Sequence, residues 1–78
     1  MKSIHDPRYL VFVEMLVQTR QQSNITQTEL AQRLGKPQSY VAKIENLDRR
    51  IDIVELADWL VSLGTTPQSF SAQLSWWH

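Results

Sequence analysis

A stripe of polar side chains between residues 38 and 46 is the part of the chain best suited to binding chemistry. Its members share one face of a helix because their spacing is i, i+1, i+4, i+5 and i+8, and they are Gln38, Ser39, Ala42, Lys43 and Asn46. The polar members carry donors and acceptors that match base edges and phosphates, and alanine lets a helix approach a groove closely. The stripe is therefore suited to reading DNA. A solvated helix face that binds nothing has the same composition, so that alternative stays open.

Two short helices, broken at Gly35, are needed to present this stripe. The apolar residues that recur at helical spacing on either side of the break are Leu30, Ala31, Leu34, Val41 and Ile44. Gly35 adopts a left-handed conformation without a Cβ penalty, so it can end one helix and redirect the chain. Thr26 with Glu29 three residues later forms a capping box that marks the first helix start. The pattern predicts a helix-turn-helix motif over residues 26–46.

This spacing resembles that of the phage repressor and Cro family of helix-turn-helix proteins, also called the xenobiotic response element (XRE) family. The resemblance runs without gaps from about Arg20 to Asn46. The residues that carry it are Thr26-Gln27-x-x-Leu30-Ala31-x-x-Leu34-Gly35 and then Gln38-Ser39-x-Val41-x-x-Ile44-Glu45-Asn46. It implies a lambda repressor-like DNA-binding domain that binds duplex DNA as a regulator of transcription.

The resemblance also implies roles for the matching positions. Those that face the bases are Gln38, Ser39, Ala42 and Lys43. Gln27 holds a phosphate from the start of the first motif helix, and Arg20 pairs with Glu45 to tie the first helix to the recognition helix. The residues that we assign to the DNA backbone are Thr26, Gln27, Lys36, Tyr40, Asn46, Arg49 and Arg50.

The sequence departs from the family pattern in three ways. Pro37 stands where the family usually has Ser or Thr, so the recognition helix lacks a hydroxyl cap and must begin through the fixed φ of proline. Leu47 and Asp48 replace a glycine that often follows the Glu-Asn pair, which leaves the path of the next loop open. Ala42 offers no hydrogen bond to a base.

Size and composition limit the remaining possibilities. The 78 residues suffice for one small domain, residues 1–78, and the absence of cysteine excludes disulfides and thiolate metal sites. We find no signal peptide or membrane span, so we expect a cytoplasmic protein. All eight Lys and Arg fall in residues 1–50, which predicts a weakly positive motif face; chance clustering of surface charge is the alternative.

Helix-start and helix-end signals complete an all-α five-helix bundle. The starts are Asp6-Pro7, Asp52 with Glu55, and Thr66-Pro67, and Gly64 follows a helix end. The predicted helices are 7–22, 26–33, 37–46, 53–63 and 67–76. Helices 7–22 and 53–63 carry more apolar residues than one face can bury, which indicates a second contact surface.

The tryptophans are candidates for that contact surface. Trp76 and Trp77, together with Trp59, carry large apolar areas that are costly to leave in water, and we assign them to a homodimer or partner interface. The alternative is that they cap the core of the monomer.

The sequence contains no pattern of residues that indicates catalysis. The only histidines, His5 and His78, lie near the two ends, and there is no metal-spaced cluster or phosphate-cradling glycine loop. We expect no enzyme activity, no metal and no cofactor. The predicted function is sequence-specific binding of double-stranded DNA by a dimeric repressor, with helix 37–46 in the major groove. A protein-interaction module of the same fold, such as an antitoxin or adaptor that binds a protein partner, is the alternative.

Overall fold

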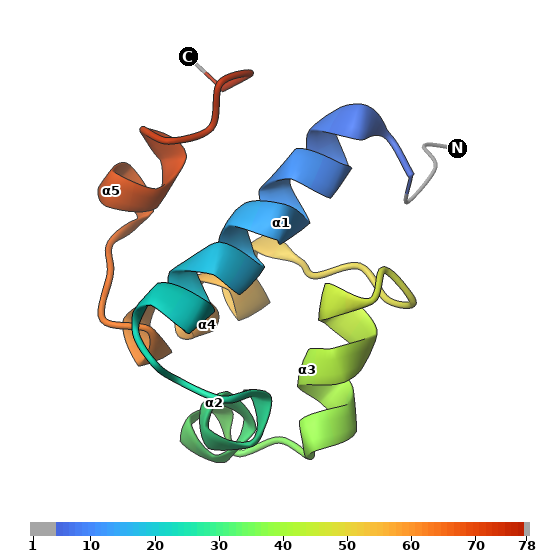
Figure 1. Ribbon diagram of the computed structural model, residues 1–78, viewed down its shortest axis with the longest axis vertical. Helices are drawn as coiled ribbons and strands as arrows, with labels where there is room; N and C mark the ends of the chain where they lie inside the picture. The colour runs from blue at the N-terminus through green and yellow to red at the C-terminus, as the bar shows by residue number, and fades with distance from the viewer. Residues whose placement is uncertain (1–4, 78) are drawn as a thin grey trace.

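The computed structural model describes residues 5–77, which contain five helices and no strand. The helices are α1 (Pro7–Gln22), α2 (Gln27–Leu34), α3 (Gln38–Glu45), α4 (Ile53–Ser62) and α5 (Pro67–Ser71). In Figure 1, α1 crosses the molecule diagonally, with α2 and α3 toward one end and α5 with the C-terminal tail toward the other. The predicted all-α fold is confirmed. No helix within residues 5–77 combines the length and hydropathy that crossing a membrane requires.

The helices begin at the capping residues that the sequence predicts. Asp6, Thr26 and Thr66 each accept a hydrogen bond from a backbone N–H in the first turn of α1, α2 and α5. Asp52 and Glu55 form the complete capping box at the start of α4. At α2 the predicted capping box is only half formed. The Thr26 hydroxyl accepts from the Glu29 N–H, but the Glu29 carboxylate accepts a hydrogen bond from Arg33 at 2.8 Å.

One apolar core holds the five helices together. Its fully or nearly fully buried members come from every helix and include Val13, Leu16, Leu30, Val41, Ile44, Trp59, Leu60, Phe70 and Leu74. The ring of Phe12 in α1 meets the ring of Phe70 in α5 edge to face, with centroids 5.9 Å apart. This core sets the angle between α2 and α3, which share the most extensive helix packing in the molecule.

The last helix is shorter than predicted. The expected range was 67–76, but α5 ends at Ser71. The side-chain amide of Gln73 donates to the carbonyl oxygen of Ser69 at 3.2 Å, while the Gln73 backbone N–H turns to Phe70. A side chain thus replaces the backbone donor that would continue the helix. The following turns still carry Leu74 into the core.

Two left-handed residues shape the turns that flank α3. Gly35 ends α2 at φ +67°, as predicted. Leu47 follows α3 at φ +66°, in the loop whose path the sequence does not predict, and the Asp48 N–H donates to the Lys43 carbonyl oxygen at 2.8 Å. In this conformation the Leu47 side chain is half-buried and packs against the core.

Replacing Gly35 with alanine is expected to lower the free energy of unfolding by about 1 kcal/mol. A Cβ at this position would meet no atom within 4 Å, so the cost comes from the backbone conformation alone. Urea denaturation of G35A measures it. Gly64 has φ +75° and equally open space, so G64A should lose a similar amount; stability unchanged in both variants would contradict the argument.

Candidate nucleic-acid interface

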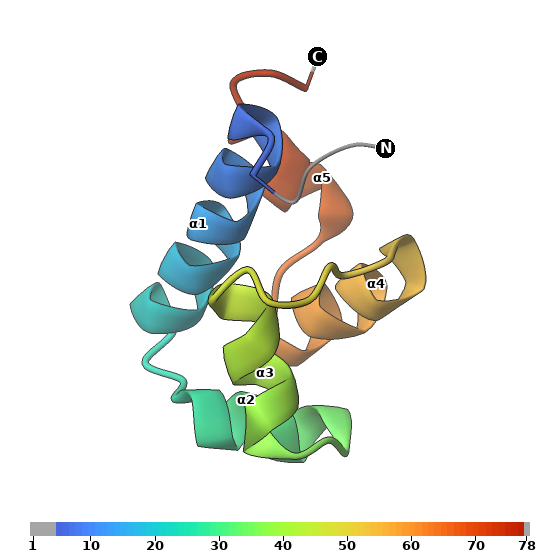
Figure 2. The same ribbon diagram turned by 90° about the vertical axis from the view of Figure 1, so that its right-hand side faces the viewer.

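The recognition stripe lies on the outer face of α3 and its C-terminal cap. Gln38, Ser39, Lys43 and Asn46 are exposed and Ala42 is half-buried. The opposite face of the same helix carries Val41 and Ile44, both fully buried in the core. Figure 2 shows α3 below the loop that connects it to α4, at the end of the molecule away from the C-terminus.

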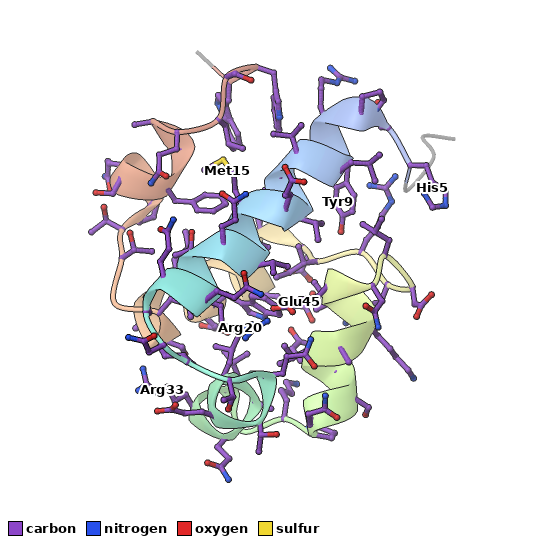
Figure 3. All side chains as sticks on the ribbon, in the orientation of Figure 1. His5, Tyr9, Met15, Arg20, Arg33 and Glu45 are labelled. Atoms are coloured by element: carbon purple, nitrogen blue, oxygen red, sulfur yellow. The ribbon has the colours of Figure 1, made fainter. Side chains whose placement is uncertain are left out.

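A buried ion pair ties α1 to α3. Arg20 Nε donates to Glu45 Oε2 at 2.7 Å, and Arg20 Nη2 donates to Glu45 Oε1 at 2.9 Å. Arg20 Nη1 also donates to the Ile25 carbonyl oxygen at 2.9 Å. Figure 3 shows the two side chains next to one another between α1 and α3. The pair expected from the resemblance is therefore formed.

Two glutamine amides extend this pair to the surface. Gln27 Nε2 donates to Glu45 Oε1 at 2.8 Å, and Gln38 Nε2 donates to Gln27 Oε1 at 2.7 Å. The chain of contacts Arg20–Glu45–Gln27–Gln38, which we call the amide relay, runs from a buried cation to an exposed amide. The Gln38 oxygen and one of its N–H groups remain for a ligand. The contact between the two glutamines is not predictable from helical periodicity, which carries no information about pairs in different helices.

The start of α3 leaves backbone donors exposed. Pro37 is the N-cap and provides no side-chain acceptor, so the first N–H groups of α3 are not capped by a side chain. Uncapped N–H groups and the positive end of the helix dipole favour an anion such as a phosphate. Lys36 is exposed immediately before this start.

The Tyr40 ring contacts two cationic side chains beside α3. Its half-buried ring packs on Trp59 with centroids 6.5 Å apart, and Lys36 Nζ and Arg49 Cζ lie 5.4 and 5.1 Å from the ring centroid. Burial raises the pKa of the Tyr40 hydroxyl. The assignment of Trp59 to a contact surface is wrong, because its side chain has 0% exposure beneath Tyr40. Trp59 lies on the face of α4 that packs against the core.

The two arginines of the loop after α3 already have partners within the protein. Arg49 Nη1 and Nη2 donate to the two carboxylate oxygens of Glu55 at 3.0 and 2.8 Å. The Arg50 guanidinium lies 4.8 Å from the centroid of the Tyr9 ring, and the Tyr9 hydroxyl accepts from the Ile51 N–H at 3.2 Å. These contacts hold the loop next to α3.

The free energy of unfolding is expected to fall at low pH, because the Glu55 carboxylate becomes protonated. Hydrogen bonds from Arg49, and then from the Asp52 N–H, lower the pKa of this carboxyl from 4.5 to about 2. Because the folded pKa lies below the unfolded one, this contribution is complete above about 4.5 and is lost as the pH falls toward 2. Urea denaturation across this range should therefore show the wild type losing its advantage over E55Q. R49M removes the larger of the two causes, so its stability should depend on pH less steeply than that of the wild type. Parallel curves for the wild type and E55Q would contradict this role of Glu55.

Trp76 and Trp77 form a stacked pair on the C-terminal tail. Their ring centroids are 5.6 Å apart at an interplanar angle of 19°, and the side chains are 38% and 52% exposed. Both line an open groove of about 370 Å³ whose apolar walls include Tyr9, Phe12 and Ile53.

Within residues 5–77, His, Cys, Asp and Glu side chains nowhere gather in threes that could hold an ion. His5 is exposed, and His78 lies outside the described residues.

Comparisons with known proteins agree with this geometry. A protein-family model described as "Helix-turn-helix" matches residues 16–70. Among solved structures, an "XRE-family like protein from Pseudomonas syringae pv. tomato str. DC3000" is similar at 44% sequence identity and a TM-score of 0.84, covering 91% of this chain and 87% of that one. No curated protein matches the chain. The family match and the solved relative each span most of the chain, and the chain therefore belongs to the XRE-type helix-turn-helix family, which is a family of DNA-binding regulators rather than of enzymes.

Proposed function

We propose that this protein is a sequence-specific reader of duplex DNA that places α3 in the major groove and the start of α2 on the phosphate backbone. The base-reading residues are Gln38, Ser39, Ala42 and Lys43. The backbone residues are Thr26, Gln27, Lys36, Tyr40, Asn46, Arg49 and Arg50. It acts in the cytoplasm as a repressor of transcription.

The amide relay is the observation that carries this proposal. A glutamine reads adenine with its amide oxygen and one N–H, which must lie in the plane of the base. Gln38 keeps both groups for a ligand while Gln27 holds the amide in one orientation. Glu45 in turn orients Gln27, and Arg20 orients Glu45. A reading group that is oriented before binding loses less conformational freedom when it meets the base.

Phosphate contacts flank the reading face on both sides. One amide N–H of Gln27 is left over from its bond to Glu45 and lies at the start of α2. The uncapped start of α3 provides further donors beside Lys36. Such contacts set the orientation of a protein on DNA and make its affinity depend on salt.

A single α3 reads only a few base pairs, so we propose a symmetric dimer on two half-sites about 34 Å apart. Selection from a random pool of duplex DNA at about 150 mM salt tests the function. We expect a two-fold symmetric consensus. A folded protein that enriches no sequence would overturn the proposal and favour the alternative function, a module that binds a protein partner.

A further inference from the structure

One face of α4 is apolar and exposed. Ile53, Val54 and Val61 are 70%, 68% and 78% exposed, and Ala57 between them is exposed as well. The other face of the helix is buried through Trp59 and Leu60. Figure 2 shows α4 at the edge of the molecule opposite α1. These are the most exposed large aliphatic side chains within residues 5–77.

The exposed residues form a stripe that is symmetric about Ala57. Ile53, Ala57 and Val61 are spaced i, i+4 and i+8, so they follow one side of the helix, and Val54 widens it at the N-terminal end. If a second α4 packs antiparallel across this stripe, Ala57 meets its own copy and the N-terminal aliphatic pair meets Val61 of the partner. A small residue at the crossing point lets the two helices approach closely.

We propose that this α4 stripe is the interface at which two copies of the chain form a two-fold symmetric dimer. The proposal names the contact surface of the dimer proposed above, and it rests on that dimer but not on DNA binding. It also locates the second contact surface that the surplus of apolar residues in this helix predicts.

The size of the surface fits such a dimer. Scaling typical side-chain areas by the exposures above, the stripe leaves on the order of 400 Å² of apolar surface in water, and Trp77 adds on the order of 100 Å². Trp77 lines the same groove as Ile53, the N-terminal residue of the stripe. A standard interface buries about 800 Å² on each side, and in homodimers about 65% of that area is apolar. The apolar area of such an interface is therefore close to the apolar area that the stripe and Trp77 together expose.

The charges at the two ends of α4 suit the antiparallel arrangement, and the exposed Asp58 lies beside Ala57 at the edge of the stripe, near Arg33. Asp52 and Glu55 lie in the cap and first turn of α4, and the Arg33 guanidinium donates to the Ser62 carbonyl oxygen at its C-terminal end at 2.8 Å, while also binding Glu29. Antiparallel packing places the acidic end of each helix beside the Arg33 end of its partner. The helix dipoles then also oppose one another favourably.

Cysteine cross-linking without DNA tests the arrangement, because the chain has no cysteine of its own. A57C should form a disulfide-linked dimer under mild oxidation. V61C is the matched control: Val61 is 78% exposed, but four residues from the axis it would lie about 12 Å from its copy along the helix. Disulfides need Cα atoms within about 7 Å, so V61C should cross-link at least tenfold more slowly.

Sedimentation of uncross-linked protein provides the second readout. Wild type should sediment as a dimer, and A57R should raise the dissociation constant at least tenfold, whereas V11R on α1 should not. Equal cross-linking of A57C and V61C, or a monomeric wild type, would overturn the interface. DNA selection separates the two proposals: a consensus with no Ala57 cross-link removes the interface alone, and a cross-link with no consensus removes the DNA function alone.

Discussion

E45Q is expected to lower the free energy of unfolding by about 3 kcal/mol, the lower end of the cost of breaking a buried ion pair. The substitution keeps the shape of the side chain but removes its charge, so the Arg20 guanidinium stays buried without a counter-ion. The two side chains are only 10% and 4% exposed. A domain of this size has a total stability of roughly 4–12 kcal/mol, so the loss is a large share. Urea denaturation measures it.

The matched control is E29Q, which makes the same chemical change in an exposed pair. Glu29 binds Arg33 at 2.8 Å, the same type of contact, but both side chains are 44% exposed. Pairs at the surface contribute at most about 1 kcal/mol. If E45Q cost no more than E29Q, the ion pair between α1 and α3 would not be a main support of the fold. A double variant that replaces Arg20 and Glu45 with apolar residues should recover part of the loss.

Q38A is expected to weaken binding to the selected DNA site by about 1 to 3 kcal/mol per half-site, which corresponds to roughly 5- to 150-fold in affinity. The alanine removes the amide that the relay orients. Discrimination at one base pair should relax, while affinity for unrelated duplexes should change little. Fluorescence anisotropy with the consensus and with single-base variants measures both effects.

Two controls distinguish a loss of base reading from a general loss of affinity for DNA. Q18A replaces an exposed glutamine of α1 and should bind like the wild type. R50A should weaken all sequences alike and reduce the slope of affinity against salt by about 1. If Q38A lost affinity equally for every sequence, Gln38 would be a backbone contact, and the relay would have another role.

The helix starts and the end of α2 were predictable because capping is local. Asp52 with Glu55, Thr66 with Pro67 and the left-handed Gly35 depend on side chains and backbone within four residues of one another. Arg20 and Glu45 were predictable for a different reason, since the resemblance to the XRE family links two positions that no local rule connects. The end of α5 was not predicted, because helical periodicity does not show that the Gln73 side chain takes the place of a backbone donor.

The partners of individual side chains were decided by the tertiary structure. The sequence determined that 53–63 is an amphipathic helix with too many apolar residues, but not that Trp59 faces the core while Ile53, Val54 and Val61 face outward. Nor did it place Gln38 against Gln27, or Arg49 against Glu55.

The physical reason is the range of the forces involved. Caps, turns and helical periodicity arise within a few neighbouring residues, so the sequence alone determined where the helices begin and which residues share a face. Which face lies inside depends on how the helices pack into one core, and contacts such as those of the amide relay exist only once α1, α2 and α3 have been brought together.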